Sequence, residues 1–158
     1  MPLDIAFAKP AAYLAVSESA RASRCRATND LCVIDGTRFF VRGTVPVPVR
    51  ELDEYFVWGM WAEVSRRVFN RYREFYDADG SGEPPHAGRL CGDKAMKGYA
   101  GVEGHPVAIQ FGPADRRPVF TLKPSEHLLS REQQAGITLH RVHEILSAIF
   151  PNDFSSLN

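Results

Sequence analysis

The residues best suited to chemistry lie in the segment PSEHLLSREQQAGIT, where Glu126 and His127 stand side by side. Near neutral pH, an imidazole beside a carboxylate can act as an acid, a base or a hydrogen-bond anchor. The structural alternative is that His127 caps the end of a strand while Glu126 pairs with an arginine. Both roles depend on an element that holds the two side chains in place.

A second candidate lies in FVWGMWAEVS (56–65), which contains both tryptophans of the chain. Read as a strand, this segment places Trp58 and Met60 on a wholly apolar face, because side chains alternate along a strand. Trp61 and Glu63 fall on the opposite, mixed face. The pattern predicts Trp58 in the core, and it leaves open whether Trp61 is core or faces a ligand.

The segment LCVIDGTRFFVRG (31–43) predicts a β-hairpin, because Asp35-Gly36 between two β-rich runs is a strong hairpin signal. With these two residues as the turn, Cys32 and Ile34 are expected to share a face with Phe39. The prolines of the following TVPVPV (44–49) favour an edge strand or an extended segment, since proline donates no backbone hydrogen bond.

Arginines and aromatic residues are common anchors of binding surfaces. If the hairpin packs beside residues 56–65, two of its arginines flank Trp61. The predicted binding residues from both segments are Arg38, Arg42, Trp61, Glu63, Glu126, His127 and Gln133.

Other motifs are incomplete. DADGSGEPPHAG (77–88) begins like a calcium loop, but Gly88 stands where a bidentate glutamate is required. His140 and His143 are three residues apart on a helix, and this spacing also suits an ordinary polar face. No GxSxG motif and no phosphate-binding glycine loop occurs. We therefore expect no metal and no cofactor, and we assign no catalytic residue.

The composition limits the partners. The 158 residues suit a single domain, with residues 1–12 as an irregular lead-in and 151–158 as a tail. Basic and acidic residues balance at 19 each, which argues against nucleic acid or a membrane as the partner. Three unpaired-looking cysteines and the lack of a signal or membrane segment indicate a cytoplasmic protein with reduced thiols.

The predicted fold class is α+β, with a mainly antiparallel sheet and about three to four flanking helices. Ser65 is expected to cap a helix whose apolar stripe includes Val68, Phe69 and Tyr72. Ser130 and Gln133 fit a capping box for a short helix, and Thr138 is expected to cap a longer helix at the C-terminal end.

Taken together, DLCVIDGTRFFVRG, FVWGMWAEVS leading to RVFNRY, and EHLLSREQQAGIT resemble a bacterial family known as domain of unknown function 2199. The likeness extends from about Pro10 to Leu146. The family implies no activity. Members often open with a CxxCG…H segment that looks zinc-binding, whereas MPLDIAFAKP here contains neither Cys nor His. The residues that match the family pattern are Arg42, Gly43, Trp58, Gly59, Trp61, His127, Gln133, Gly136 and Thr138.

Two functional hypotheses follow. The first is a non-catalytic binding or regulatory module for a protein partner or a small polar ligand. The second is a small enzyme with acid–base chemistry around His127 and either Glu126 or Glu63. A pocket that joins Trp61, Arg42 and His127 would favour the enzyme.

Overall fold

The computed structural model describes residues 4–92, 96 and 98–150, and this part of the chain contains eight strands and five helices. In chain order they are β1 (Asp4–Ala6), α1 (Ala11–Leu14), α2 (Glu18–Arg24), β2 (Cys25–Ala27), β3 (Leu31–Ile34), β4 (Arg38–Val49), β5 (Glu54–Val64), α3 (Arg66–Glu74), β6 (His86–Cys91), β7 (Pro106–Gln110), β8 (Val119–Leu122), α4 (Leu128–Ala135) and α5 (Leu139–Ile149).

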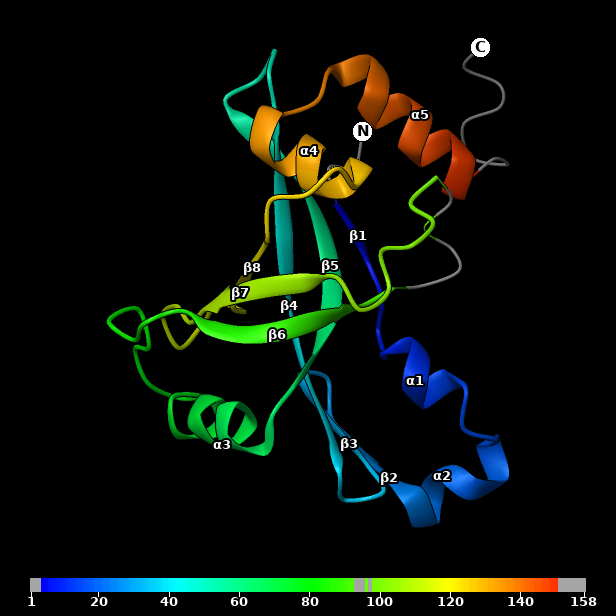
Figure 1. Ribbon diagram of the computed structural model, residues 1–158, viewed down its shortest axis with the longest axis vertical. Helices are drawn as coiled ribbons and strands as arrows, with labels where there is room; N and C mark the ends of the chain where they lie inside the picture. Colours follow the sequence, from blue (N-terminus) through cyan, green and yellow to red (C-terminus); the bar gives the residue numbers. More distant parts are fainter. Residues whose placement is uncertain (1–3, 93–95, 97, 151–158) are drawn as a thin grey trace.

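Five strands, β4 to β8, form a closed barrel. Each pairs with the next in antiparallel fashion, and β4 closes the ring by a parallel pairing of Thr44 with Val119 on β8. In Figure 1, β6 and β7 cross in front of the long β4–β5 ribbon. The remaining pairings are β1 parallel to β5, and β2 and β3 antiparallel to their neighbours. The predicted α+β class with a mainly antiparallel sheet is therefore confirmed.

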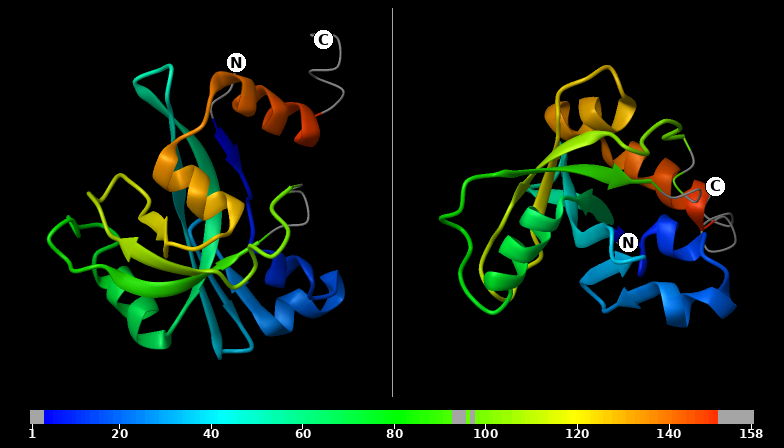
Figure 2. Two further views of the ribbon diagram at one scale, coloured as in Figure 1. Left: turned by 45° about the horizontal axis from the view of Figure 1, so that its top comes forward. Right: turned by 60° about the horizontal axis from the view of Figure 1, so that its bottom comes forward.

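The main core fills the barrel and the space under α3, α4 and α5. Alternate residues of β5, including Phe56, Trp58 and Met60, are fully buried in it. The prediction that Trp58 is a core residue is confirmed. Figure 2 shows α3 at one end of the barrel and α4 with α5 towards the other.

The predicted hairpin forms, but its loop has three residues instead of two. Ile34 pairs with Arg38, so that Asp35, Gly36 and Thr37 make up the connection. Asp35 and Gly36 have φ values of 54° and 65°, in the left-handed region that glycine adopts without strain. The local signal therefore placed the turn correctly and left its length undetermined.

The extra loop residue reverses the expected faces. Cys32 is the cross-strand partner of Phe40, so these two side chains share a face. A two-residue turn would instead place Cys32 on the same face as Phe39. A one-residue shift in register moves a whole strand's side chains to the other face. Phe39 therefore belongs to the main core, while Cys32 and Phe40 belong to a second one.

The second core lies between the β3–β5 sheet and the N-terminal helices α1 and α2. Its buried residues are Val16, Cys32, Ile34, Phe40, Trp61 and Cys91. Helices α1 and α2 lie beside β2 and β3 at the lower right of Figure 1. The N-terminal segment also contains β1, which pairs with the middle of β5. The expectation of an irregular lead-in over residues 1–12 is wrong, because this segment adds a strand to the sheet and begins α1.

Two of the predicted helix starts are confirmed and one is corrected. Ser65 accepts a hydrogen bond from the Val68 N–H, and Thr138 caps α5. Helix α4 begins at Leu128 with His127 as its cap, three residues before the predicted cap at Ser130.

Residues 151–158, expected to form a tail, lie outside the described part of the chain. Within the described residues, no helix combines the length and apolar character needed to cross a membrane.

Candidate functional site

A cleft of about 660 Å³ opens between α3, the β2–β3 turn, β4 and the loop before β8. Its lining combines charged, phenolic and hydroxyl groups, which distinguishes it from a gap in apolar packing. The lining residues are Asp30, Thr44, Tyr72, Tyr76, Ala114, Asp115, Arg116, Arg117 and Val119.

Asp30 is the centre of the hydrogen bonding in this cleft. One of its carboxylate oxygens accepts a hydrogen bond from the Tyr76 hydroxyl at 2.6 Å. The other accepts from Nε of Arg117 at 2.9 Å. Three separate segments, the β2–β3 turn, the end of α3 and the loop before β8, therefore meet at one carboxylate.

The fold keeps Asp30 in its charged form. Burial favours the neutral acid, but the hydrogen bonds from Tyr76 and Arg117 and the charges of Arg117 and Arg42 outweigh it. The pKa of Asp30 is consequently lowered from its ordinary value. A carboxylate with 19% of its side-chain surface exposed thus remains an acceptor and a negative charge inside the cleft.

Arg42 lies beside this cluster with part of its hydrogen-bonding capacity unused. Its Nη1 donates to the Asn29 carbonyl at 3.1 Å, and its guanidinium lies over the Trp61 ring at 5.9 Å. Its Nε is buried and has no hydrogen-bond partner in the part of the chain that the structure describes. Burial and the charge of Arg117 both lower the pKa of Arg42, and Asp30 offsets this only in part. The charge of Arg117 therefore acts on Arg42 more strongly than the charge of Asp30 does.

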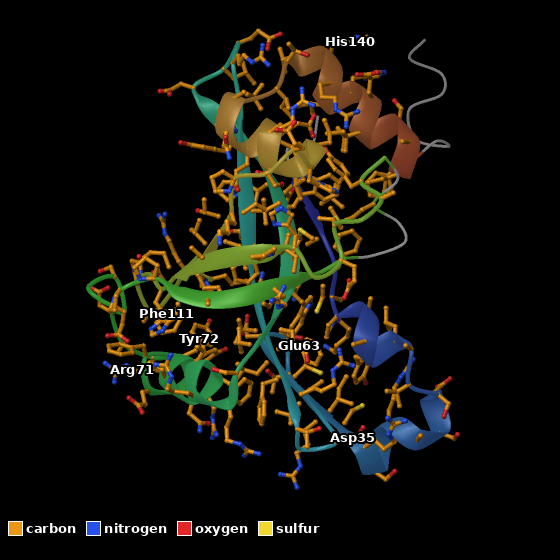
Figure 3. The ribbon with its side chains drawn as sticks, viewed as in Figure 1. Asp35, Glu63, Arg71, Tyr72, Phe111 and His140 are labelled. Atoms are coloured by element: carbon orange, nitrogen blue, oxygen red, sulfur yellow. The ribbon has the colours of Figure 1, made fainter. Side chains whose placement is uncertain are left out.

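Tyr72 and Tyr76 form the aromatic side of the cleft, and their rings meet edge to face at 6.0 Å. Burial, with the nearby Asp30 charge, raises the pKa of Tyr72 to about 12, so its phenol remains a hydrogen-bond donor at physiological pH. Figure 3 shows Tyr72 on α3 next to Phe111, with ring centroids 5.2 Å apart. This contact fixes α3, and with it both tyrosines, against the barrel.

The remaining side of the cleft is fixed by the pairing that closes the barrel. The Thr44 N–H donates to the Pro118 carbonyl at 2.9 Å, directly after Arg117. The loop carrying Arg116 and Arg117 is therefore fastened to β4, the strand that also carries Arg42. The positions of the charged groups thus depend on barrel closure.

The structure separates the binding residues expected from the sequence into several places. Arg38 and Glu63 form a bidentate ion pair at 2.9 Å on the outer surface of β4 and β5. Trp61 is 1% exposed, and its indole N–H donates to the Phe7 carbonyl at 2.9 Å. Trp61 is thus a core residue with a satisfied donor, and the Arg42 guanidinium lies over its ring.

The residues expected around α4 hold that helix in place. His127 accepts the Leu129 N–H through Nδ1 at 3.1 Å, and its Nε2 lies 3.0 Å from the Ala100 carbonyl. Gln133 ties α4 to β8 through the Leu122 N–H and the Phe120 carbonyl. Glu126 is exposed in the loop before the helix.

The acid–base set of Glu63 and His127 is not assembled around Trp61. Glu63 lies in the lower half of Figure 3, whereas α4, which His127 caps, lies near the top. Among the described residues, no three His, Cys, Asp or Glu side chains gather in a way that could hold a metal ion.

Sequence reasoning missed Asp30, Tyr76 and Arg117. Tyr76 and Arg117 are 46 and 87 positions from Asp30, and no motif links them. The one usable signal was Tyr76 at the polar edge of the α3 stripe, where a hydroxyl can reach a partner. Arg42 is the predicted residue that the structure does bring to this site.

Comparison with known proteins gives a family and no function. No curated protein and no solved structure matches the chain. The model of a family described as "Uncharacterized protein conserved in bacteria (DUF2199)" matches residues 1–137, most of the chain and all five barrel strands. With this match, the protein belongs to the DUF2199 family of uncharacterised bacterial proteins.

Proposed function

We propose that the protein is a binding module that takes a small anionic ligand into the Asp30–Arg117 cleft, with no catalytic step at this cleft. The observation that carries this proposal is the imbalance of charge there. Arg116 and Arg117 line the cleft with two carboxylates, Asp30 and Asp115, and the charge of Arg42 acts on Asp30 in addition. Burial and the charge of Arg117 lower the pKa of Arg42, and an anion in the cleft would offset the Arg117 charge.

The groups available define the ligand chemically. Planar guanidinium groups recognise carboxylate or phosphate oxygens with paired donors. Tyr72 offers a protonated phenol, and Tyr76 an aromatic surface. A carboxylate or phosphate attached to a small body that contacts the tyrosines fits this cleft. Such a ligand belongs to the small polar class expected from the sequence.

Arg116 provides the sharpest test. Its side chain is exposed, lines the cleft and has no hydrogen-bond partner among the described residues, so removing its charge should leave the fold intact. We would titrate the wild type and Arg116→Gln with phosphate and with citrate by calorimetry. We expect the variant to bind about tenfold more weakly, as for the loss of one charged contact.

The matched control is Arg26→Gln, which removes the same charge from an exposed position on β2. It should bind like the wild type. Equal losses in both variants would mean a general charge effect, and an absence of binding to both anions in the wild type would refute the proposal.

We also propose a cytoplasmic location. The three cysteines are free thiols, and two of them are buried, as suits a reducing compartment. The formal net charge of zero supports a small ligand over nucleic acid or a membrane surface as the partner.

A further inference from the structure

A second hollow, of about 740 Å³, lies on the outer face of β6, β7 and β8. Its floor consists of small side chains on neighbouring strands, since Ala87 pairs with Ala108 and Ala108 with Thr121. Glu63 and Lys123 add charges to its lining. The hollow is therefore an open groove with an apolar floor, and it shares no lining residue with the cleft around Asp30.

Ser125 and His105 are the chain neighbours of Pro124 and Pro106, two of the residues that line this groove. The Ser125 hydroxyl lies 2.8 Å from Nε2 of His105. Nδ1 of His105 lies 2.9 Å from the Pro106 carbonyl, which can only accept, so the proton of the neutral ring sits on Nδ1. Nε2 is then the acceptor for the Ser125 hydroxyl.

The same reasoning removes His127 as the base. Nδ1 of His127 accepts the Leu129 N–H, so its Nε2 carries the proton and donates to the Ala100 carbonyl. Both ring nitrogens are occupied by the backbone. The His127 ring instead packs against His105 at 5.9 Å and limits the orientations of that ring.

Ser125 is held at the start of a helix. Its N–H donates to Ser130 Oγ at 3.1 Å, which fastens it to the first turn of α4, and its Oγ accepts the His127 N–H. The first N–H groups of a helix lack backbone partners and give that end a partial positive charge. Negative charge that develops on a group attacked by Ser125 would therefore form near a favourable dipole.

We propose that Ser125 is a nucleophile and His105 its general base, and that the pair hydrolyses small acyl esters seated in the groove. Such a nucleophile–base–orienter arrangement is the signature of covalent catalysis by serine. It differs from the acid–base set expected from the sequence, since His105 replaces His127 and neither Glu126 nor Glu63 is required.

The reaction balances without any further reagent than ester and water. His105 Nε2 takes the Ser125 proton as Oγ bonds to the ester carbonyl carbon. The bond to the alkoxy oxygen then breaks, and His105 gives its proton to that oxygen, which releases an alcohol. Water next loses a proton to His105 and attacks the acyl-serine, and the proton returns to Oγ as the carboxylic acid leaves.

A fluorophosphonate probe tests the pair directly, because it bonds covalently to activated serine hydroxyls. We expect mass spectrometry to place the adduct on Ser125 in the wild-type protein. His105→Gln should slow labelling by at least about tenfold, a modest share of what a general base supplies. Ser23→Ala, at an exposed serine bound only to a backbone carbonyl, should label like the wild type. An adduct elsewhere, or equal labelling of His105→Gln, would overturn the proposal.

A second measurement needs no variant and so does not depend on correct folding of one. The labelling rate of the wild type should not rise in proportion to the hydroxide concentration, because a base of the protein removes the Ser125 proton. A rate that rises in proportion to hydroxide throughout would show that no base assists Ser125. Hydrolysis of p-nitrophenyl acetate should be lost in Ser125→Ala and retained in Ser23→Ala.

Discussion

At the scale of single residues, Asp30 links the chemistry of the cleft to the stability of the fold. Its lowered pKa means that the folded state holds the charged carboxylate more favourably than the unfolded chain does. The stabilisation is fully present above the unfolded pKa of about 4, and it is lost as the pH falls through the lower folded value.

Asp30→Asn should therefore be most destabilising near neutral pH. The difference in unfolding free energy between wild type and variant should shrink below about pH 4, where the wild-type carboxyl gains its proton. Urea unfolding at pH 7, 5 and 3 measures this difference. Asp53→Asn, in the exposed turn between β4 and β5, serves as the control. Parallel pH curves for wild type and Asp30→Asn would contradict the assignment.

At the scale of the elements, the crossing of β4 and β8 depends on a missing side chain. A Cβ placed on Gly43 would lie 2.5 Å from Cε1 of the Phe120 ring and 2.7 Å from the Pro118 carbonyl. Phe120 is fully buried in the barrel. The absence of a side chain at Gly43 is therefore what lets β8 approach β4 closely enough to close the ring.

Gly43→Ala should destabilise the protein by about 1–3 kcal/mol, as for other overpacked cores. The matched control is Gly82→Ala, because a Cβ there meets no atom within 4 Å. Urea or thermal unfolding compares the two variants. If both have the stability of the wild type, the close approach at Gly43 is not a constraint on the barrel.

Some helices and strands follow directly from local sequence patterns, and others do not. The strands and helices with clear periodicity, such as β5 and α3, form as expected because their burial patterns are local. The hairpin loop is one residue longer than expected. The sequence could not predict this, because threonine at position 37 suits either the loop or the strand. The start of α4 was misplaced because histidine is an uncommon cap, and here Nδ1 of His127 takes the role of a serine or aspartate oxygen.

At the scale of the whole molecule, the N-terminal helices shield a second core that contains buried thiols. Burial, with the neighbouring Cys25, raises the pKa of Cys32 to about 11. Burial and the charge of Glu103 also raise the pKa of Cys91. The thiolate is the reactive form of cysteine. Both residues therefore react slowly with thiol reagents, because burial limits access to them and because they remain protonated.

Ellman's reagent at pH 8 should therefore modify one thiol rapidly in the native protein, the half-buried Cys25. The other two should react only at the rate at which the second core opens, and all three should react at once in denaturant. Cys25→Ser should abolish the fast phase. Rapid reaction of two or more thiols would mean that α1 and α2 do not cover this core stably.

Most of the candidate site could not be predicted from the sequence, because its residues come together only in the complete fold. Asp30, Tyr76 and Arg117 meet only after the barrel closes, and closure rests on the pairing of Thr44 with Val119. Such a long-range parallel contact leaves no periodic trace in the sequence. Composition and local patterns could give the fold class and the position of Arg42 on a strand, and they could not give the partners that surround it.

Barrel closure also has a consequence for how the chain is made. Strand β4 is complete at Val49 and pairs with β3 and β5, but β8, the strand that closes the barrel on it, begins at Val119. At a synthesis rate of ~5–20 residues per second, a ribosome needs roughly 4–14 s to add the intervening chain. During that interval the part of β4 beyond its pairing with β3 lacks the partner that closes the barrel at Thr44. The nascent protein therefore presents a temporary strand edge to the cell's chaperones, and β8 ends that exposure when it emerges.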